Sequence, residues 1–230
     1  MSSLSDRART RLIWTGGAAA LLLVIMAALA FVFTPPKVPA EAIQTAVTRT
    51  PTLIEKAWQL PAAARFKREL VWQSNPSTCG PASLANVFQS LGEDAQTEAA
   101  ALEHTGKCWW GICPVGLTLD EVAEIAGVKT NRRVIVLRDL TPEQFREHLR
   151  RSNDPTNRYV VNFARTPIFG AGGGHHSPIG GYLEAEDLVF VLDVNETFRP
   201  WLVERERLFA AIDTLDGDKK RGLILIEPKP

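Results

Sequence analysis

The sequence predicts an α+β domain in which a helical layer faces a mostly antiparallel sheet, preceded by one N-terminal membrane-spanning helix. Segments whose apolar residues recur at helical spacing occupy the first half of the domain, and short segments rich in Val, Ile and Leu occupy the second half. A long uncharged apolar segment near the start of the chain predicts the membrane helix.

The N-terminal apolar segment, residues 12–33, contains no charged residue. As a helix it would be about 33 Å long at about 1.5 Å per residue, enough to cross a bilayer core. Three arginines precede it within residues 1–11, so we expect a cytoplasmic N-terminus and a membrane anchor that leaves the rest of the chain on the exported, periplasmic side. A cleaved signal peptide, which would release a secreted domain, is the alternative.

The rest of the chain is expected to form a connector and one main domain. Residues 34–57 begin with a proline-rich linker, and helical character follows over residues 40–58. Residues 58–230 provide enough chain for a single domain with its own core. The formal net charge is zero and both signs are mixed along the chain, which argues against a nucleic-acid-binding protein.

Three segments of the main domain predict helices. The first runs from Cys79 to Leu91, with Gly92 as its stop signal. The second covers Thr118–Ala126, with a capping threonine at its start and Gly127 at its end. The third covers Thr141–Arg151 and has proline at its first helical position. The predicted strands are residues 158–163, 177–183, 187–194 and 222–227.

The chain has three cysteines, which an exported protein must pair or protect. Cys108 and Cys113 are close in sequence, so we expect a disulfide between them in an oxidising compartment. Two alternatives are a thiolate pair for a soft metal, which would still lack further ligands, and free buried thiols. With the disulfide formed, Cys79 is the one cysteine left over.

Cys79 is placed where a thiol becomes reactive. The N-terminus of a helix carries unsatisfied N–H groups and partial positive charge, which favour thiolate over thiol. Asn75, Ser77 or Thr78 could cap this helix. An ordinary buried cysteine is the alternative interpretation.

A thiol nucleophile needs an oxyanion donor, a base, and a group that orients the base. Gln73, six residues before Cys79, is the candidate donor, together with the backbone N–H of the cysteine. His175 and His176 follow three glycines, and the pattern alone leaves either as the base. Asp193 lies near the end of the next predicted strand and is the candidate orienting group. Asn195 competes with it for that role, since an amide can also orient an imidazole.

Five sequence blocks occur in a fixed order: residues 73–84, 174–182, 192–194, 200–201 and 220–222. Through these blocks, residues 58–228 resemble the catalytic domain of the phytochelatin synthases, papain-like thiol acyltransferases of the glutathione pathway. The resemblance implies a papain-like fold. It also implies the following roles: Cys79 as nucleophile, His175 rather than His176 as base, Asp193 as orienting group and Gln73 as oxyanion donor. Residues in the matching blocks that become candidate substrate contacts are Gly174, Ser177 and Arg221.

The resemblance implies a reaction in two halves. Cys79 would attack the cysteinyl–glycine peptide of glutathione, release glycine and keep a γ-glutamylcysteinyl thioester. A second glutathione, its metal thiolate, or water would then accept the acyl group. No tightly bound cofactor or resident metal is implied, and a heavy-metal ion such as cadmium would enter as part of a thiolate substrate. The expected partners are glutathione, the membrane through the N-terminal helix and a second copy in a homodimer, with no nucleic acid.

Two departures from the family pattern bear on the acceptor. Glu196 occupies a position where family members commonly carry arginine, and the helix around residues 120–126 lacks the cysteines that members often have there. Both favour a form that mainly cleaves glutathione. The alternative function is an exported papain-like cysteine peptidase of the leader-processing kind. A membrane-tethered binding module with a decayed site is disfavoured, because all four chemical positions are occupied.

Overall fold

The computed structural model describes residues 36–109, 111–113 and 116–229, together with Leu22. The chain divides into two units, Met1–Lys37 and Val38–Pro230, and all named helices and strands lie in the second. The membrane helix expected over residues 12–33 lies outside the described residues, apart from Leu22. Within the described ranges, no helix is both long enough and apolar enough to cross a membrane.

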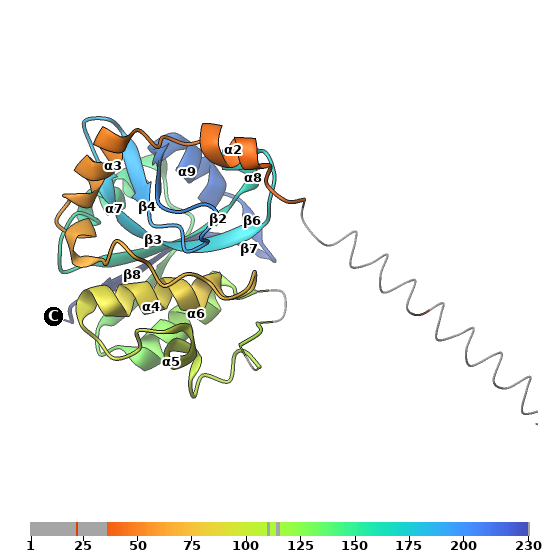
Figure 1. Cartoon of the computed structure of the whole chain (residues 1–230). Helices are drawn as coiled ribbons and strands as arrows, with labels where there is room; N and C mark the ends of the chain where they lie inside the picture. The colour runs from red at the N-terminus through yellow and green to blue at the C-terminus, as the bar shows by residue number, and fades with distance from the viewer. Residues whose placement is uncertain (1–21, 23–35, 110, 114–115, 230) are drawn as a thin grey trace, which may run out of the picture. The chain divides into compact units, whose positions relative to one another are not determined.

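A six-stranded sheet forms the centre of the unit Val38–Pro230 (Figure 1). Its spatial order is β1-β8-β2-β3-β4-β5, and every neighbouring pair is antiparallel. The α+β class with an antiparallel sheet is therefore confirmed. The strands are β1 (Arg133–Leu137), β2 (Arg158–Ala164), β3 (Gly174–Leu183), β4 (Leu188–Val191), β5 (Trp201–Glu204) and β8 (Gly222–Glu227), with a separate ribbon of β6 (Leu215–Asp216) and β7 (Lys219–Lys220).

Helices cover both faces of this sheet, so the prediction of a single helical layer was wrong (Figure 1). The core on one face includes residues of α4 (Cys79–Leu91), α5 (Glu98–Leu102) and α6 (Leu119–Lys129). The core on the other face includes residues of α7 (Pro142–Arg151), α8 (Thr166–Phe169) and α9 (Arg205–Ile212). The sheet thus lies between two hydrophobic layers.

The alternation of side chains along β2 shows how the two cores are separated. Val160 belongs to the core beneath α4, whereas its neighbours Tyr159 and Val161 belong to the core beneath α9. Successive residues of a strand point to opposite faces, so a strand that is apolar throughout can supply both layers. Burying each such side chain stabilises the fold by roughly 1.5–3 kcal/mol.

The predicted helices of the main domain are present, with one difference in their ends. Helix α4 begins at Cys79 and ends before Gly92, whose φ of 71° is the left-handed conformation that closes a helix. Helix α6 begins after a capping box at Thr118 but continues through Gly127, so the predicted stop was wrong. Gly127 stays helical and Thr130 takes the C-cap position instead.

Residues 38–57 are part of the second unit. The chain forms two helices here, α2 (Ala40–Thr45) and α3 (Pro51–Trp58), rather than one helix over residues 40–58. The break arises because Thr48 forms a β-bridge with Leu202 next to the sheet edge. A short 3₁₀ helix, η1 (Ala63–Arg65), then leads towards the segment that carries Gln73.

Strand β1 is a strand that the sequence prediction missed in the first half of the domain, as it also missed helix α5 and the 3₁₀ helix η1. This strand lies between α6 and α7 in the chain and pairs with the last strand, β8. Helices and strands are therefore interleaved, and the expected division into helices first and strands later does not hold.

Candidate active site

Cys79 is the first residue of α4 and lies beside the end of β3. Its side chain is 7% exposed, and it is the one free cysteine, because Cys108 and Cys113 are joined by a disulfide. The sulfur lies 3.7 Å from Nδ1 of His176. A buried thiol at a helix N-terminus, in contact with an imidazole, is placed to ionise.

No side chain caps the helix at Cys79, which corrects the expectation for Asn75, Ser77 and Thr78. Thr78 occupies the N-cap position without a side-chain cap hydrogen bond. The Asn75 Oδ1 atom accepts hydrogen bonds from the backbone N–H and the hydroxyl of Ser77 instead. A capping side chain would accept hydrogen bonds from the backbone N–H groups at this helix end. Because no side chain does so, these N–H groups can donate to a developing oxyanion.

His175 is oriented by Asp193. Its Nε2 donates to Asp193 Oδ1 at 2.9 Å, and both side chains are buried. The carboxylate also accepts from the indole N–H of Trp201 at 3.1 Å and from the backbone N–H of Asn195 at 3.0 Å. Asn195 therefore holds the aspartate in place, and its own Oδ1 accepts from the Thr197 backbone.

Arg165 is the residue of this site that the sequence did not reveal. Its Nη2 donates to Asp193 Oδ1 at 3.1 Å, and its Nη1 lies 3.0 Å from Oδ2. The guanidinium carbon is 3.5 Å from the ring centre of Phe198, which is a cation–π contact. Arg165 follows the last residue of β2, and nothing in its local sequence marks it as the partner of Asp193, twenty-eight residues away.

The electrostatics favour a charged pair between the nucleophile and the base. Burial alone would raise the pKa of the Cys79 thiol, but the hydrogen bonds and charges of His175 and then His176 hold that pKa well below its ordinary value. Burial and the charge of Arg165 act to lower the pKa of His175, but Asp193 and the thiol raise it. The pKa of Asp193 is lowered, because Arg165 and His175 outweigh the effect of burial. Thiolate, imidazolium and carboxylate are the forms that this arrangement stabilises.

Gln73 is held by its backbone beside Val194, which shares a small buried cluster with Cys79. Its N–H donates to the carbonyl of Val194, the residue after Asp193, at 2.8 Å. Its side-chain Nε2 donates to the carbonyl of Asn75 at 3.0 Å, and Oε1 is buried without a hydrogen-bond partner among the described residues. The amide nitrogen has a second N–H, which is the group available for an oxyanion.

The three candidate substrate contacts differ in position. Gly174 is exposed and lies against Arg221: a Cβ atom on it would be 2.4 Å from Nη1 of that arginine. Ser177 is fully buried, and its hydroxyl has no hydrogen-bond partner in the described part of the chain. The expectation that Ser177 contacts substrate is therefore not supported by its position, whereas Gly174 and Arg221 lie together.

Arg221 belongs to a small polar network at the same end of the sheet. Its Nη1 donates to Oδ1 of Asn162 at 2.6 Å, and its Nη2 lies 3.3 Å from Asp216. Asn162 is opposite His176 in the β2–β3 register, and it donates to Asp216 at 2.8 Å. This network places a positive charge close to the cysteine.

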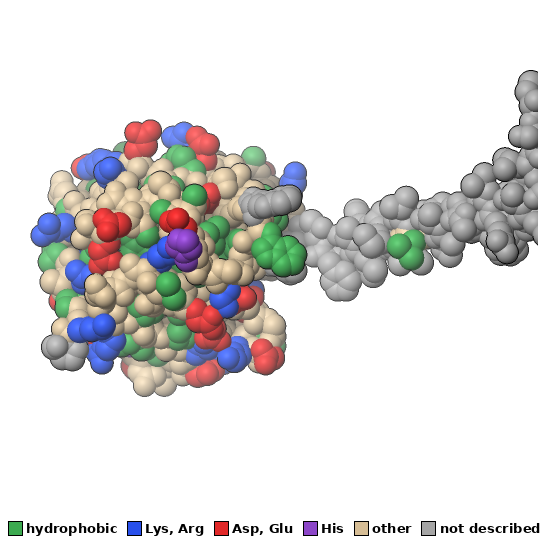
Figure 2. Space-filling model, turned by 90° about the horizontal axis from the view of Figure 1, so that it is seen from below, with side chains coloured by type: hydrophobic (Ala, Val, Ile, Leu, Met, Phe, Trp, Pro, Cys, Tyr) green, Lys and Arg blue, Asp and Glu red, His purple; other side chains and the backbone are tan. Residues whose placement is uncertain are grey.

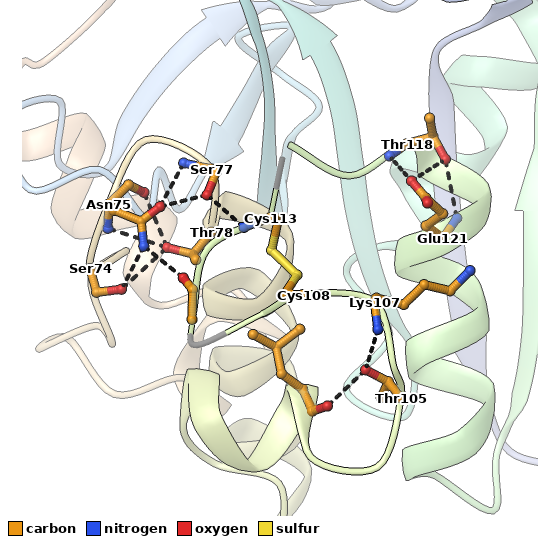
Figure 3. The surroundings of a disulfide bond; sticks show 12 residues. Ser74, Asn75, Ser77, Thr78, Thr105, Lys107, Cys108, Cys113, Thr118 and Glu121 are labelled. Atoms are coloured by element: carbon orange, nitrogen blue, oxygen red, sulfur yellow. Dashed lines mark hydrogen bonds between the residues drawn. A yellow bond between two sulfur atoms is a disulfide. The ribbon is translucent and has the colours of Figure 1, made fainter. Parts of the chain in front are cut away.

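The disulfide Cys108–Cys113 lies next to the loop that leads into α4 (Figure 3). The backbone N–H of Cys113 donates to the Ser77 hydroxyl at 3.0 Å, and Asn75 Nδ2 donates to the carbonyl of Gly111 at 2.9 Å. Two hydrogen bonds thus join the disulfide-closed turn to the loop before Cys79. Because Asn75 also accepts from Gln73, the turn is linked to the candidate oxyanion donor.

A hollow of about 700 Å³ opens beside this loop. Its lining includes Ser74, Thr78, Glu98, Leu102, Glu103 and Cys108. Figure 2, which views the molecule from below, shows acidic, basic and apolar side chains mixed on the face that it draws rather than a basic stripe.

Within the described ranges, no group of three or more His, Cys, Asp and Glu residues could hold a metal ion.

A comparison with protein families identifies the chain. The model of the phytochelatin synthase family matches residues 33–223. The chain belongs to the phytochelatin synthase family. The match covers Cys79, the histidine pair and Asp193, so the whole candidate site lies within the family domain.

Curated relatives in this family are named glutathione gamma-glutamylcysteinyltransferases. One from Schizosaccharomyces pombe is 24% identical over 184 residues, which cover 70% of this chain and 42% of the relative. Another, from Arabidopsis thaliana, is 26% identical over 184 residues, covering 67% of this chain and 37% of the relative. The chain therefore spans less than half the length of these phytochelatin synthase relatives.

The fold of this family member is shared with a solved structure of a C39-like peptidase from Bacillus anthracis. That structure covers 71% of this chain and 96% of its own, with a TM-score of 0.52 and 14% sequence identity. At this identity the likeness concerns the fold alone. It supports the papain-like architecture of the phytochelatin synthase domain.

Proposed function

We propose that this chain is a thiol acyltransferase that cleaves glutathione and forms a γ-glutamylcysteinyl thioester on Cys79. Family membership and the names of the curated relatives support the substrate class. The observation that carries the proposal is the His175–Asp193 hydrogen bond of 2.9 Å, in a buried site where the pKa of Cys79 is held low. A thiolate nucleophile and an oriented imidazole are what acyl transfer requires.

In the first half-reaction the Cys79 thiolate would attack the carbonyl carbon of the cysteinyl–glycine peptide. A bond forms between sulfur and carbon, and the carbonyl oxygen takes the negative charge. The backbone N–H of Cys79 and the second amide N–H of Gln73 are the proposed donors to this oxyanion. The C–N bond then breaks, and His175 gives its proton to the departing glycine nitrogen.

Arg221 is the proposed contact for a substrate carboxylate. It is the cation that lies against Gly174, at the end of β3 that carries the histidines. The hollow beside the disulfide turn suits the carboxylates of glutathione less well, because Glu98 and Glu103 line it. Like charges would oppose binding of an anionic peptide there.

In the second half-reaction an acceptor would attack the thioester, and His175 would take its proton. A second glutathione, free or as a heavy-metal thiolate such as the cadmium complex, gives a longer peptide, whereas water completes a hydrolysis. In this proposal the metal is part of a substrate and needs no protein site. Glu196, which replaces a commonly found arginine, favours water as the main acceptor.

The proposed location is the exported side of a membrane, with residues 12–33 as the anchor. The disulfide between Cys108 and Cys113 supports an oxidising compartment. Secretion after signal cleavage is the alternative, and a homodimer stays a prediction from the sequence.

The test is glycine release by the purified full chain incubated with glutathione, with and without cadmium. The proposal expects glycine in both cases, and none from Cys79→Ser. Chromatography of the same reaction separates the acceptors, since peptides longer than glutathione mark transfer and γ-glutamylcysteine marks hydrolysis. An alternative function, an exported cysteine peptidase, would be favoured if the chain released no glycine but cleaved a leader peptide.

A further inference from the structure

His176 touches the nucleophile from the opposite face of the sheet to His175. The two are consecutive in β3, so their side chains point to opposite faces. His175 is opposite Phe163, and its ring lies 5.6 Å from the ring of that residue. His176 is opposite Asn162, and its Nδ1 lies 3.7 Å from the Cys79 sulfur. The sulfur is thus in direct contact with the His176 imidazole, and His175 also acts on the thiol through hydrogen bonding and charge.

The hydrogen bonds of His176 define its tautomer. Its Nε2 is buried without a hydrogen-bond partner in the described part of the chain, and the ring is 2% exposed. A buried N–H without an acceptor is costly, so the proton belongs on Nδ1, where it can be donated to the sulfur. The Nε2 atom then carries only a lone pair.

We propose that His176 is a second catalytic imidazole, which stabilises the Cys79 thiolate when it leaves the thioester. The inference rests on the proposed function. During the second half-reaction His175 must take the proton of the acceptor, so its Nδ1 cannot also donate to the sulfur. His176 bonds no other group of the described chain and supplies that donor.

The second half-reaction regenerates the Cys79 thiolate. The acceptor forms a bond to the thioester carbon, and its proton passes to His175 Nδ1. The C–S bond breaks, the electron pair stays on the Cys79 sulfur, and the Nδ1–H of His176 donates to that charge. The product is a thiolate beside an imidazolium, the pair with which the first half-reaction begins.

Besides the two imidazoles, one cation acts on this sulfur directly, and two carboxylates act through its partners. Arg221, which comes just before β8, interacts with Cys79 by charge. Asp216 partly offsets that arginine, and Asp193 acts through His175. Substitution of His176 leaves these groups in place. A shift in the pH at which Cys79 ionises therefore reports the loss of the imidazole itself.

The test uses His176→Phe in the full chain, because phenylalanine keeps a planar ring in the buried position. His148→Phe is the matched control, since His148 is a partly buried histidine bonded to the Tyr159 hydroxyl and absent from the site. Cys79 is the one free thiol, so iodoacetamide labelling followed against pH reports its ionisation. We expect the labelling curve of His176→Phe to move to higher pH, while His148→Phe follows the wild type.

Rapid-quench kinetics test the step. A hydrogen bond to a charged group corresponds to about a ten- to hundredfold rate effect. His176→Phe should release one equivalent of glycine per enzyme in a burst and then turn over ten- to hundredfold more slowly, with the acyl-enzyme visible by mass. His176→Asn, which retains an N–H donor, should recover part of the turnover. An unshifted labelling curve in His176→Phe would show that His176 does not stabilise the Cys79 thiolate. Slow turnover of His176→Phe without a burst of glycine would show that His176 does not act in the second half-reaction.

Failure of the proposed function gives a different result. If the wild-type chain releases no glycine from glutathione, the proposed cleavage of glutathione is wrong. The labelling curve of His176→Phe still tests whether His176 stabilises the thiolate, because labelling needs no substrate.

Discussion

Arg165 and Asp193 form a buried ion pair next to His175, in which Arg165 Nη2 donates to Asp193 Oδ1 at 3.1 Å and Nη1 lies 3.0 Å from Oδ2. The arginine keeps the buried carboxylate charged, and its own charge opposes the imidazolium that the aspartate supports. The orientation of His175 thus depends on a residue that does not touch the sulfur.

Removal of Arg165 should destabilise the fold strongly. Arg165→Met leaves Asp193 as a buried charge without its main partner, which costs about 3–5 kcal/mol. Urea denaturation measures this change. The double variant Arg165→Met with Asp193→Asn removes the charge as well, so it should be more stable than Arg165→Met alone. Equal stability of the wild type and Arg165→Met would contradict this role.

Glycine release should follow a bell-shaped dependence on pH. The lowered pKa of Cys79 means that the thiolate forms below the ordinary thiol value of 9.0, which sets the acid limb. The raised pKa of His175 means that the imidazolium persists above its ordinary value of 6.5, which sets the alkaline limb. The two limbs belong to the coupled pair rather than to single residues. A measured profile of kcat/KM that rises without a plateau up to pH 9 would refute the charged pair.

Asp193, and not Asn195, should orient the base. Asp193→Ala removes the acceptor for His175 Nε2 and should lower kcat/KM by about a hundredfold, within the range for positioned acid–base catalysis. Asn195→Ala keeps the backbone N–H that bonds Asp193, so it should stay within about twofold of the wild type. Steady-state kinetics on both variants decide between them, and a larger loss in Asn195→Ala would reverse the assignment.

The disulfide should matter for activity as well as for stability. Replacement of both Cys108 and Cys113 by serine removes a short covalent loop, and about 2 kcal/mol of stability should be lost. Glycine release should also slow, because the turn is hydrogen-bonded to Ser77 and Asn75. Ser77→Ala is the matched control: it cuts one hydrogen bond between turn and loop and keeps the disulfide. Wild-type rates in both variants would show that the turn does not position the loop.

The sequence predicted those features of the fold that depend on neighbouring residues. The bounds of α4 followed from apolar spacing and a glycine stop, and β8 from a short apolar run. The missed features depend on distant contacts. Residues 75–78 look like capping residues, but the disulfide turn occupies two of their side chains. Likewise, β2 and β3 are buried on both faces. Their sequences therefore show no alternation of polar and apolar residues from which the burial of Ser177 could be predicted.

In the candidate site too, the residues within sequence motifs were predicted, whereas contacts between distant residues were not. Cys79, Gln73 and the histidines lie in motifs that the sequence displays, and the structure brings them to one end of the sheet. The ion pair of Arg165 with Asp193 and the contact of His176 with the Cys79 sulfur arise from tertiary packing, in which side chains far apart in the sequence meet. Such partners carry no local signal.

The proposed reaction requires a γ-glutamylcysteinyl thioester on Cys79, and trapping that species is the decisive experiment. The full chain is mixed with glutathione, quenched in acid within a turnover, digested and examined by mass spectrometry. We expect a γ-glutamylcysteinyl adduct on the peptide that contains Cys79, absent from Cys79→Ser and increased in His176→Phe. Glycine release without any adduct on Cys79, or an adduct on another residue, would rule out Cys79 as the nucleophile.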